Sequence, residues 1–519
     1  MMFLNLCINC MSLFLKRELM KTHLKPIFKK NETICNLQCN SLFHLFFLNT
    51  PFLGVSDWSS FFFFSFSPTS TMKFLPIVLV LCCALSLLGT AEEEGQFLVL
   101  TDVHIADDYV AGSAPRTFCT AGTGKAGVHG YYNCDTPMAT FRSSLQFAQR
   151  AGPYDFVLWL GDSPTKYLEH PQHNQTTAHV MENVQRVADT IAAAFPDTQV
   201  FPSLGNHDHN PDDALAPNET AYLDAVAKLW ARWLPADALA TVRRGGYYTA
   251  PVRSTPGLRV VSLNTLYWSA TNAWTANATG DIGGQLAWLK QVLAQARAAR
   301  EHVLVVGHVP PVFEVAINQW RPDFYDRYTA LLAPHADLVV GHVFGHMHQD
   351  LFSVLAPPAC PACLLSPAMV VPGVTPRSSS MAPDAGPMPG KNPALRVYRY
   401  RADALVDYTQ YYADLAAANA AQQALAWRVD YTFRAEYGLP DLSAQSFHAL
   451  ARRVAANRDD WCAFYSHLFV RNLRAPQAYA NLVRRAVVCS NLYTTLPEYL
   501  SCTTSQLPAF VCDFNTTMQ

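Results

Sequence analysis

Charged side chains are scarce in this chain. Asp, Glu, Lys and Arg together make up only 15% of its 519 residues, and the formal net charge is -2. A chain without a net basic field lacks the electrostatic footprint of proteins that bind DNA or RNA. The composition therefore argues against a nucleic acid polymer as partner.

Residues 74–89 form an apolar run that is too short to span a bilayer. This uncharged run is shorter than the ~20 residues that a membrane helix needs. Lys73 precedes it and the small residues 89–91 follow it. A basic start, an apolar core and a small-residue cleavage site are typical of a secretory signal peptide. We interpret 72–91 as a signal peptide and expect no integral membrane span, with a transmembrane anchor as the alternative.

Residues 1–71 lack the pattern of either a helix or a strand. They are rich in Phe, Leu and Cys, and they lie ahead of Met72, where the predicted signal begins. Our hypothesis is that translation starts at Met72 and that 1–71 is non-native. An unstructured leader that is cleaved off is the alternative.

A second close cysteine pair is missing beside Cys360-Pro-Ala-Cys363, which favours a structural role for that motif over a zinc or redox site. An even number of cysteines in a secreted chain indicates up to four disulfides. We predict the pair Cys119–Cys134 around a short Gly-rich loop and leave the others open. The cysteines after residue 91 are Cys119, Cys134, Cys360, Cys363, Cys462, Cys489, Cys502 and Cys512.

Asparagine-linked glycosylation is expected at the sequons that follow the predicted signal. Each has Thr two residues after Asn, and such sites carry glycans in secreted proteins. The predicted sites are Asn174, Asn218, Asn277 and Asn515.

Short apolar strands alternate with helical segments from residue 96 onward. Helical periodicity covers 138–150, 175–195, 219–233 and 284–299. Buried strands between helices predict a layered α/β sheet. From about residue 413 the pattern becomes helical, with aromatic stripes that are typical of a core.

Polar side chains follow these strands at the point where each apolar run stops. In open α/β sheets, ligands bind just beyond the carboxyl ends of strands, so we expect these side chains to meet at one rim. In D-x-H and H-x-H, residues two apart in an extended backbone face the same way. Carboxylate, amide and imidazole donors suit borderline metal ions. The candidate metal ligands are Asp102, His104, Asp162, Asn206, His308, His346 and His348.

The order D-x-H, G-D, G-N-H-D, G-H and G-H-x-H resembles the calcineurin-like metallophosphoesterases over about 96–350. GDSP, GNHDHNP, LNTLYW, GHVPP and FGHMHQD, with DYTQYYADL near the C-terminus, resemble one branch, the acid sphingomyelinase-like phosphodiesterases. The resemblance implies an α/β fold: a metallophosphoesterase double β-sandwich flanked by helices over 96–400. A sphingomyelinase-type, helical and disulfide-bonded C-terminal region would cover 401–519.

The resemblance also implies roles for individual residues. Asp102, His104 and His348 would hold one of two zinc ions, and Asn206, His308 and His346 the other. Asp162 would bridge both ions, and a hydroxide activated by the metals would attack phosphorus. His207 would stabilise the phosphoryl oxygens or protonate the leaving group, and Asp208 would orient His104 or His207 from behind.

One position departs from the branch, which has a histidine four residues after the bridging aspartate. Here that position is Lys166. Three interpretations stay open: Lys166 serves as the acid, His170 or His173 reaches in, or His207 acts alone in a weakened enzyme.

The leading functional prediction is a secreted, extracellular or lysosomal, monomeric phosphodiesterase for soluble nucleotide or phosphocholine-containing substrates. No saposin-like segment stands before Asp102, so sphingomyelin, a sphingolipid, is the alternative substrate. A phosphomonoesterase uses similar metals but is disfavoured by the D-x-H start. A secreted binding protein on the same fold is a further alternative, against which the complete ligand set argues.

Overall fold

A computed structural model gives the fold of residues 94–132, 134–165, 176–314, 317–377, 390–473, 477–505 and 507–512. Several sequence-based predictions lie outside these described residues: the leader 1–71, the signal 72–91, Lys166 with His170 and His173, and the sequons Asn174 and Asn515.

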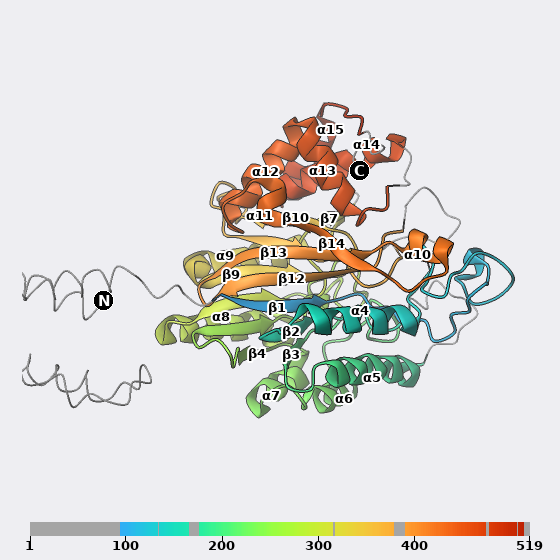
Figure 1. The fold of residues 1–519 in the computed structure, drawn as a ribbon. Helices are drawn as coiled ribbons and strands as arrows, with labels where there is room; N and C mark the ends of the chain where they lie inside the picture. The colour runs from blue at the N-terminus through green and yellow to red at the C-terminus, as the bar shows by residue number, and fades with distance from the viewer. Residues whose placement is uncertain are drawn as a thin grey trace, which may run out of the picture. The chain divides into compact units, whose positions relative to one another are not determined.

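Two six-stranded sheets form the centre of the described chain (Figure 1). In the first sheet, β1, β2 and β3 run parallel, and β12, β13 and β14 add antiparallel strands beside β1. In the second, β5, β6, β9 and β11 run parallel, with antiparallel β4 and β10 at the edges. The first sheet is β14 (Trp427–Thr432), β13 (Ala404–Ala413), β12 (Ala394–Arg401), β1 (Gly95–Leu100), β2 (Phe156–Trp159) and β3 (Gln199–Pro202). The second is β10 (Leu351–Leu355), β11 (Ser366–Val370), β9 (Val339–Phe344), β6 (His302–Val306), β5 (Leu258–Ser262) and β4 (Tyr248–Pro251).

Continuous apolar runs become central strands because both faces of each sheet are covered. β2 and β3 are buried at every position. Within the first sheet, the Phe97 ring stacks on Phe156 with centroids 4.6 Å apart and on Tyr398 at 5.0 Å. Such cross-strand aromatic pairs fix the register of neighbouring strands.

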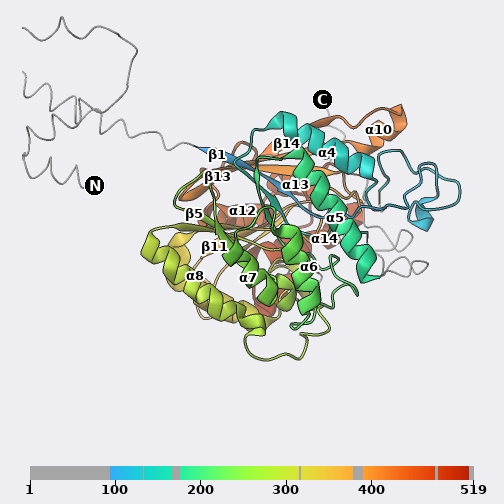
Figure 2. The ribbon, with the colours of Figure 1, turned by 90° about the horizontal axis from the view of Figure 1, so that it is seen from below.

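Helices cover the outer faces of the sheets (Figures 1 and 2). α4 and α5 pack against each other, α7 packs on β4, and α8 packs on β6. α12 and α14 pack on β10 at the opposite side. The predicted helices at 138–150, 175–195, 219–233 and 284–299 correspond to α4, α5, α6 and α8. The helices are α4 (Met138–Ala151), α5 (Thr177–Ala194), α6 (Thr220–Trp230), α7 (Ala236–Gly245), α8 (Gln285–Ala299), α9 (Pro322–Leu332), α10 (Leu415–Ala421), α11 (Phe433–Tyr437), α12 (Ala444–Ala456), α13 (Arg458–Leu468), α14 (Gln477–Leu492) and α15 (Leu496–Thr504).

The first sheet continues past residue 400 into the C-terminal region. β13 pairs with β12 from Ala394↔Tyr412 to Arg401↔Ala404, and β14 pairs with β13. The domain boundary expected between residues 400 and 401 therefore lies inside the hairpin of β12 and β13. The two strands are paired through backbone hydrogen bonds on both sides of that boundary. Beyond them the chain is helical, and disulfides Cys462–Cys512 and Cys489–Cys502 tie this region, which confirms a helical, disulfide-bonded C-terminus.

Two further disulfides and two sequons lie on the described chain. Cys119 pairs with Cys134, and Cys360 pairs with Cys363 between β10 and β11. Asn218 and Asn277 are exposed. Among the described residues, none of the helices has the length and apolar character of a bilayer span.

Candidate metal centre

The candidate metal ligands follow five strands of the two sheets and meet at one rim. Asp102 and His104 follow β1, Asp162 follows β2, and Asn206 follows β3 in the first sheet. His308 follows β6 of the second sheet, and His346 with His348 follows β9. Carboxylate and imidazole donors from both sheets come within metal-binding reach of one another. The convergence expected from the strand ends is thus present in the fold.

The backbone at this rim is unusual for residues that carry side chains. Five of the seven candidate ligands have positive φ, a region that non-glycine residues rarely occupy and that costs about 1–3 kcal/mol each. Strain of this kind persists where the surrounding structure fixes it, which is characteristic of functional sites. The five are Asp102 (φ 48°), His104 (43°), Asp162 (56°), His346 (72°) and His348 (57°).

Glycines let two of the strand-end turns touch. A Cβ on Gly161 would lie 2.3 Å from the backbone nitrogen of Gly205, and one on Gly205 would lie 2.2 Å from that of Asp162. Any side chain there would push the β2 and β3 turns apart. The Gly-Asp and Gly-Asn-His motifs therefore need their glycines for close backbone approach.

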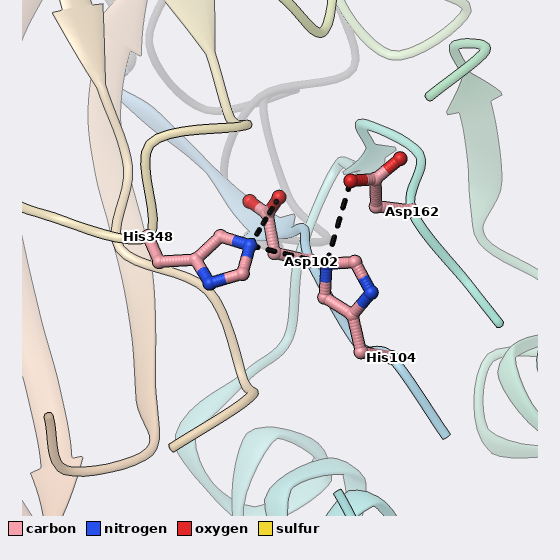
Figure 3. A group of neighbouring side chains, drawn as sticks. All are labelled: Asp102, His104, Asp162 and His348. Carbon is pink, nitrogen blue, oxygen red and sulfur yellow. Dashed lines mark hydrogen bonds and ion pairs between the residues drawn. The ribbon is translucent and has the colours of Figure 1, made fainter. Parts of the chain in front are cut away.

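A first group comprises Asp102, His104, Asp162 and His348, all buried (Figure 3). The Nε2 atoms of His104 and His348 face each other at 3.0 Å. His348 Nε2 lies 3.3 Å from Asp102 Oδ1, and His104 Nε2 lies 3.4 Å from Asp162 Oδ2. Four donor atoms thus surround one point.

A second group shares Asp162 and adds Asn206, His308 and His346. His308 Nε2 lies 3.1 Å from Asp162 Oδ2 and 3.0 Å from Asn206 Oδ1. His346 Nδ1 lies 2.8 Å from the same Asn206 oxygen. Asp162 belongs to both groups, as the bridging position requires.

The hydrogen bonds behind the histidines fix which nitrogen faces each group. The Nδ1 atoms of His104, His308 and His348 donate to the carbonyl oxygens of Pro164, Leu160 and Arg377, at 2.9, 2.6 and 2.7 Å. A carbonyl only accepts, so these neutral rings carry their proton on Nδ1 and present the Nε2 lone pair to the carboxylates. The nitrogen lone pairs then face carboxylate and amide oxygens with no proton between them. A bound cation would turn these repulsive contacts into favourable ones.

Asp162 supports the same interpretation. Its buried Oδ2 faces His308 Nε2 at 3.1 Å and His104 Nε2 at 3.4 Å, and in the tautomers given above neither nitrogen has a proton to donate to it. An ionised oxygen left so would be costly to bury, whereas a metal ion would satisfy it. The residues present therefore fit a two-metal centre.

The carboxylates are held in the ionised form that binds cations. Burial alone would raise the pKa of Asp102, but His348 and His308 hold it well below its usual value. Burial likewise opposes the lowered pKa of Asp162, which His308 and His207 outweigh. Burial also opposes protonation of His308, yet Asp162 and Asp102 raise its pKa to about 9. The site thus concentrates negative charge beside imidazoles.

His207 lies at the edge of the first group. Its backbone N–H donates to Asp162 Oδ1 at 2.9 Å, and its ring centroid is 5.2 Å from that of His104. Its side chain keeps 12% exposure, and its Nδ1 donates to Asp212 Oδ2 at 2.8 Å. This carboxylate fixes the orientation of the ring and the proton on Nδ1.

Asp208 does not take the place expected behind His104 or His207. Its Oδ1 accepts from the Ser163 backbone N–H at 2.8 Å, and its Oδ2 accepts from Asp162 and Gly205 at 3.0 and 2.8 Å. Burial and the Asp162 charge raise the pKa of Asp208. Asp208 thus clamps the two glycine turns rather than a histidine ring, because three backbone N–H groups converge on it.

Two residues at the site carry no motif signal. Asp212 lies in the run that begins at Asn206, where a nearby acid could have been suspected as a partner for His207. Gln319, whose Oε1 is 3.2 Å from His346 Nε2, follows the short strand β8 (Ile317–Asn318), which belongs to neither of the two six-stranded sheets. Only the fold brings it to the site.

Comparisons with known proteins agree with this geometry. A calcineurin-like phosphoesterase family model matches residues 95–350, and a model of the acid sphingomyelin phosphodiesterase C-terminal region matches residues 365–507. Human acid sphingomyelinase-like phosphodiesterase 3b is 34% identical across 73% of this chain and 83% of its own length. Human cyclic GMP-AMP phosphodiesterase SMPDL3A is 30% identical across 72% of this chain and 83% of its own. Sphingomyelin phosphodiesterase A of Dictyostelium discoideum is 32% identical across 72% of this chain and 62% of its own.

The two matched regions cover the rim, the C-terminal helices and every strand of both sheets except β10. The resemblance drawn from the strand-end motifs is thereby confirmed. This chain belongs to the acid sphingomyelinase-like phosphodiesterases, a branch of the calcineurin-like metallophosphoesterases, and is a phosphodiester hydrolase.

Proposed function

We propose that this chain is a secreted, binuclear zinc phosphodiesterase that hydrolyses phosphodiester or pyrophosphate bonds in soluble nucleotide or phosphocholine-containing substrates. The observation that carries the proposal is the convergence of three Nε2 lone pairs and one Nδ1 lone pair on buried oxygens of Asp102, Asp162 and Asn206. Neutral rings have no proton for these contacts, so cations must satisfy them. Without metal these are protons on the rings, as the raised pKa of His308 indicates, and we infer that two metal ions replace them in the loaded centre.

The ligand chemistry favours zinc. Imidazole nitrogens with carboxylate and amide oxygens are the donors that zinc accepts. In our assignment, Asp102, His104 and His348 would hold one ion, and Asn206, His308 and His346 would hold the other. Asp162, which belongs to both groups, would contribute to holding both ions. When bound, two such ions supply Lewis-acid stabilisation of a phosphoryl group and a nucleophile at near-neutral pH.

His207 acts on the leaving group in this proposal. Asp212 accepts the hydrogen bond from Nδ1 and would stabilise the protonated ring, whose Nε2–H would then be given to the departing oxygen. The ring stands beside His104 and is partly exposed, whereas the four ligands of the first group are buried. His207 is therefore the proposed catalytic acid, and Lys166 keeps the three interpretations given above.

Substrate class is argued from the relatives. Proteins that cover most of this chain are named cyclic GMP-AMP phosphodiesterases, which supports a nucleotide substrate. A second candidate is sphingomyelin, because the C-terminal region matches the acid sphingomyelin phosphodiesterase model. Four disulfides support passage through an oxidising compartment, and so a secreted or lysosomal location.

The test is turnover by the full chain secreted from cells, loaded with zinc. We would assay bis-p-nitrophenyl phosphate, cyclic GMP-AMP, ATP, CDP-choline and sphingomyelin side by side at pH 5 and pH 7. Asp162→Asn is the matched control, since it keeps the size of the bridging side chain and removes its charge. Metal content is measured on both proteins by mass spectrometry.

We expect hydrolysis of a soluble diester or pyrophosphate, two zinc ions per chain, and a loss of at least about 10³-fold in Asp162→Asn, in line with the weight of metal electrostatics. Hydrolysis of sphingomyelin alone would replace the proposed substrate with the second candidate. Stoichiometric zinc without any turnover would contradict the enzyme and favour a binding protein on this fold.

A further inference from the structure

One of the four histidines at the metal centre is held differently from the others. His104, His308 and His348 are each fixed by a main-chain carbonyl that accepts from Nδ1. His346 instead turns Nδ1 toward Asn206 Oδ1, and its Nε2 lies 3.2 Å from Gln319 Oε1. A side chain therefore stands where the other three rings have backbone.

Gln319 is well placed to fix a ring. Its residue is only 4% exposed. Its backbone N–H donates to Val312 O at 2.9 Å, and its carbonyl accepts from Ala270 N–H at 2.9 Å. Two loops thus hold the Gln319 backbone on both sides, so its side chain projects from a fixed base.

Which ring nitrogen of His346 carries the proton depends on the metal. Amide oxygens face both ring nitrogens, Asn206 Oδ1 at Nδ1 and Gln319 Oε1 at Nε2, and either could accept the single proton of the neutral ring. A metal ion in the second group would need the Nδ1 lone pair, so in the loaded centre Nε2 would carry the proton and donate it to Gln319. The neutral ring then has its lone pair on Nδ1, the atom that faces Asn206 in the second group. Without an acceptor at Nε2, the other tautomer, which presents a proton to the metal position, becomes competitive.

We propose that Gln319 is the positioning residue of the second metal: it selects the tautomer and orientation of His346 and thereby sets the affinity of that position. The inference rests on the proposed two-metal function and deepens it. It predicts that a change at Gln319 weakens binding of the second metal and not of the first, because His346 is absent from the first group of Asp102, His104, Asp162 and His348.

Backbone carbonyls cannot be removed by substitution, whereas Gln319 can be. Gln319→Met removes the acceptor at similar length, and Gln319→Leu does so with a shorter, stiffer side chain. Gln319→Glu keeps an oxygen that can only accept. Gln285→Met is the matched control: Gln285 is also a buried amide, bonded to Asn264 N and O at 2.7 and 3.1 Å, away from the ligands.

The experiment measures zinc per chain across a series of buffered free-zinc concentrations, on the full chain, with thermal unfolding as a check of folding. We expect two zinc ions in the native chain. Gln319→Met should bind one ion with unchanged affinity and the other 10–100-fold more weakly, the usual effect of losing a group behind a ligand. Gln319→Glu should restore the second affinity to within about threefold, and Gln285→Met should lose thermal stability without changing either affinity.

Equal binding of both ions by native, Gln319→Met and Gln319→Leu chains would overturn this inference while leaving the two-metal function intact. So would a Gln319→Glu chain as weak as Gln319→Met, because a side chain that only accepts would then not suffice. A native chain that binds fewer than two ions would overturn the proposed function and this inference with it.

Discussion

Replacing Asp212 by Asn should slow only reactions that need a proton on the leaving group. The buried Asp212 carboxylate accepts from His207 Nδ1 at 2.8 Å. A hydrogen bond to a charged partner contributes about 1.5–3 kcal/mol, against about 0.5–1.5 kcal/mol for a neutral one. The loss of about 1.5 kcal/mol corresponds to roughly tenfold in rate.

The assay compares two diesters. The p-nitrophenolate of bis-p-nitrophenyl phosphate departs without a proton, whereas the alkoxide of a dinucleoside monophosphate needs one. For Asp212→Asn we expect kcat/KM to fall about tenfold for the second and less than twofold for the first. His207→Ala should show the same pattern at about 10²-fold or more.

Asp213→Asn is the matched control, since Asp213 is the next residue and its carboxylate bonds Thr271 at 3.0 Å rather than a ring of the site. It should leave both rates unchanged. Equal losses for both substrates in Asp212→Asn would refute the reasoning, because a general acid acts only where the leaving group needs one. Such a result would assign the pair of Asp212 and His207 to holding the substrate.

Three further outcomes follow from the described residues. Asp350→Asn should lower the free energy of unfolding by about 3–5 kcal/mol in urea titrations of the zinc-saturated chain, because it leaves buried Arg396 without its partner carboxylate at 2.7 Å. Although burial opposes it, Asp430 and Glu436 raise the pKa of His467, so this group stabilises the fold fully below its unfolded value of about 6.5 and stops doing so as pH rises through the folded value. The melting temperature should therefore fall above about pH 6.5, and His467→Gln should flatten that part of the profile. Removal of metal with a chelator should lower the melting temperature, and added zinc should restore it, since a ligand that binds only the folded state stabilises by about 2.7 kcal/mol at a hundred times its Kd; an unchanged melting curve would contradict a metal-dependent fold at the rim.

Most of the candidate metal ligands could be predicted from the sequence because the ends of the strands can be recognised in it. Each apolar run stops at a polar residue, and the parallel strands β1, β2, β3, β6 and β9 end at the same rim. Asp102 and His104 were therefore predictable as neighbours of His348, although 244 positions separate His104 from His348.

Other features were not predictable because they depend on loops or on both sheets at once. Gln319 contacts His346 directly, and backbone hydrogen bonds to Val312 and Ala270, which lie in two separate loops, hold it there. Asp208 looked like a partner for histidine, but its position under two glycine turns lets it take backbone N–H groups instead. β14 (Trp427–Thr432) adds a further strand to the first sheet within the region after residue 413 whose pattern indicated helices.

Neither group of metal ligands belongs to a single sheet. The first joins β1 and β2 to β9, and the second joins β2 and β3 to β6 and β9. The geometry of both metal positions therefore depends on how the two sheets pack against each other. A substitution deep between the sheets, far from any substrate, would act as a catalytic mutation by sliding one row of ligands past the other. Laboratory evolution of this enzyme should consequently find activity changes in the core as readily as at the rim.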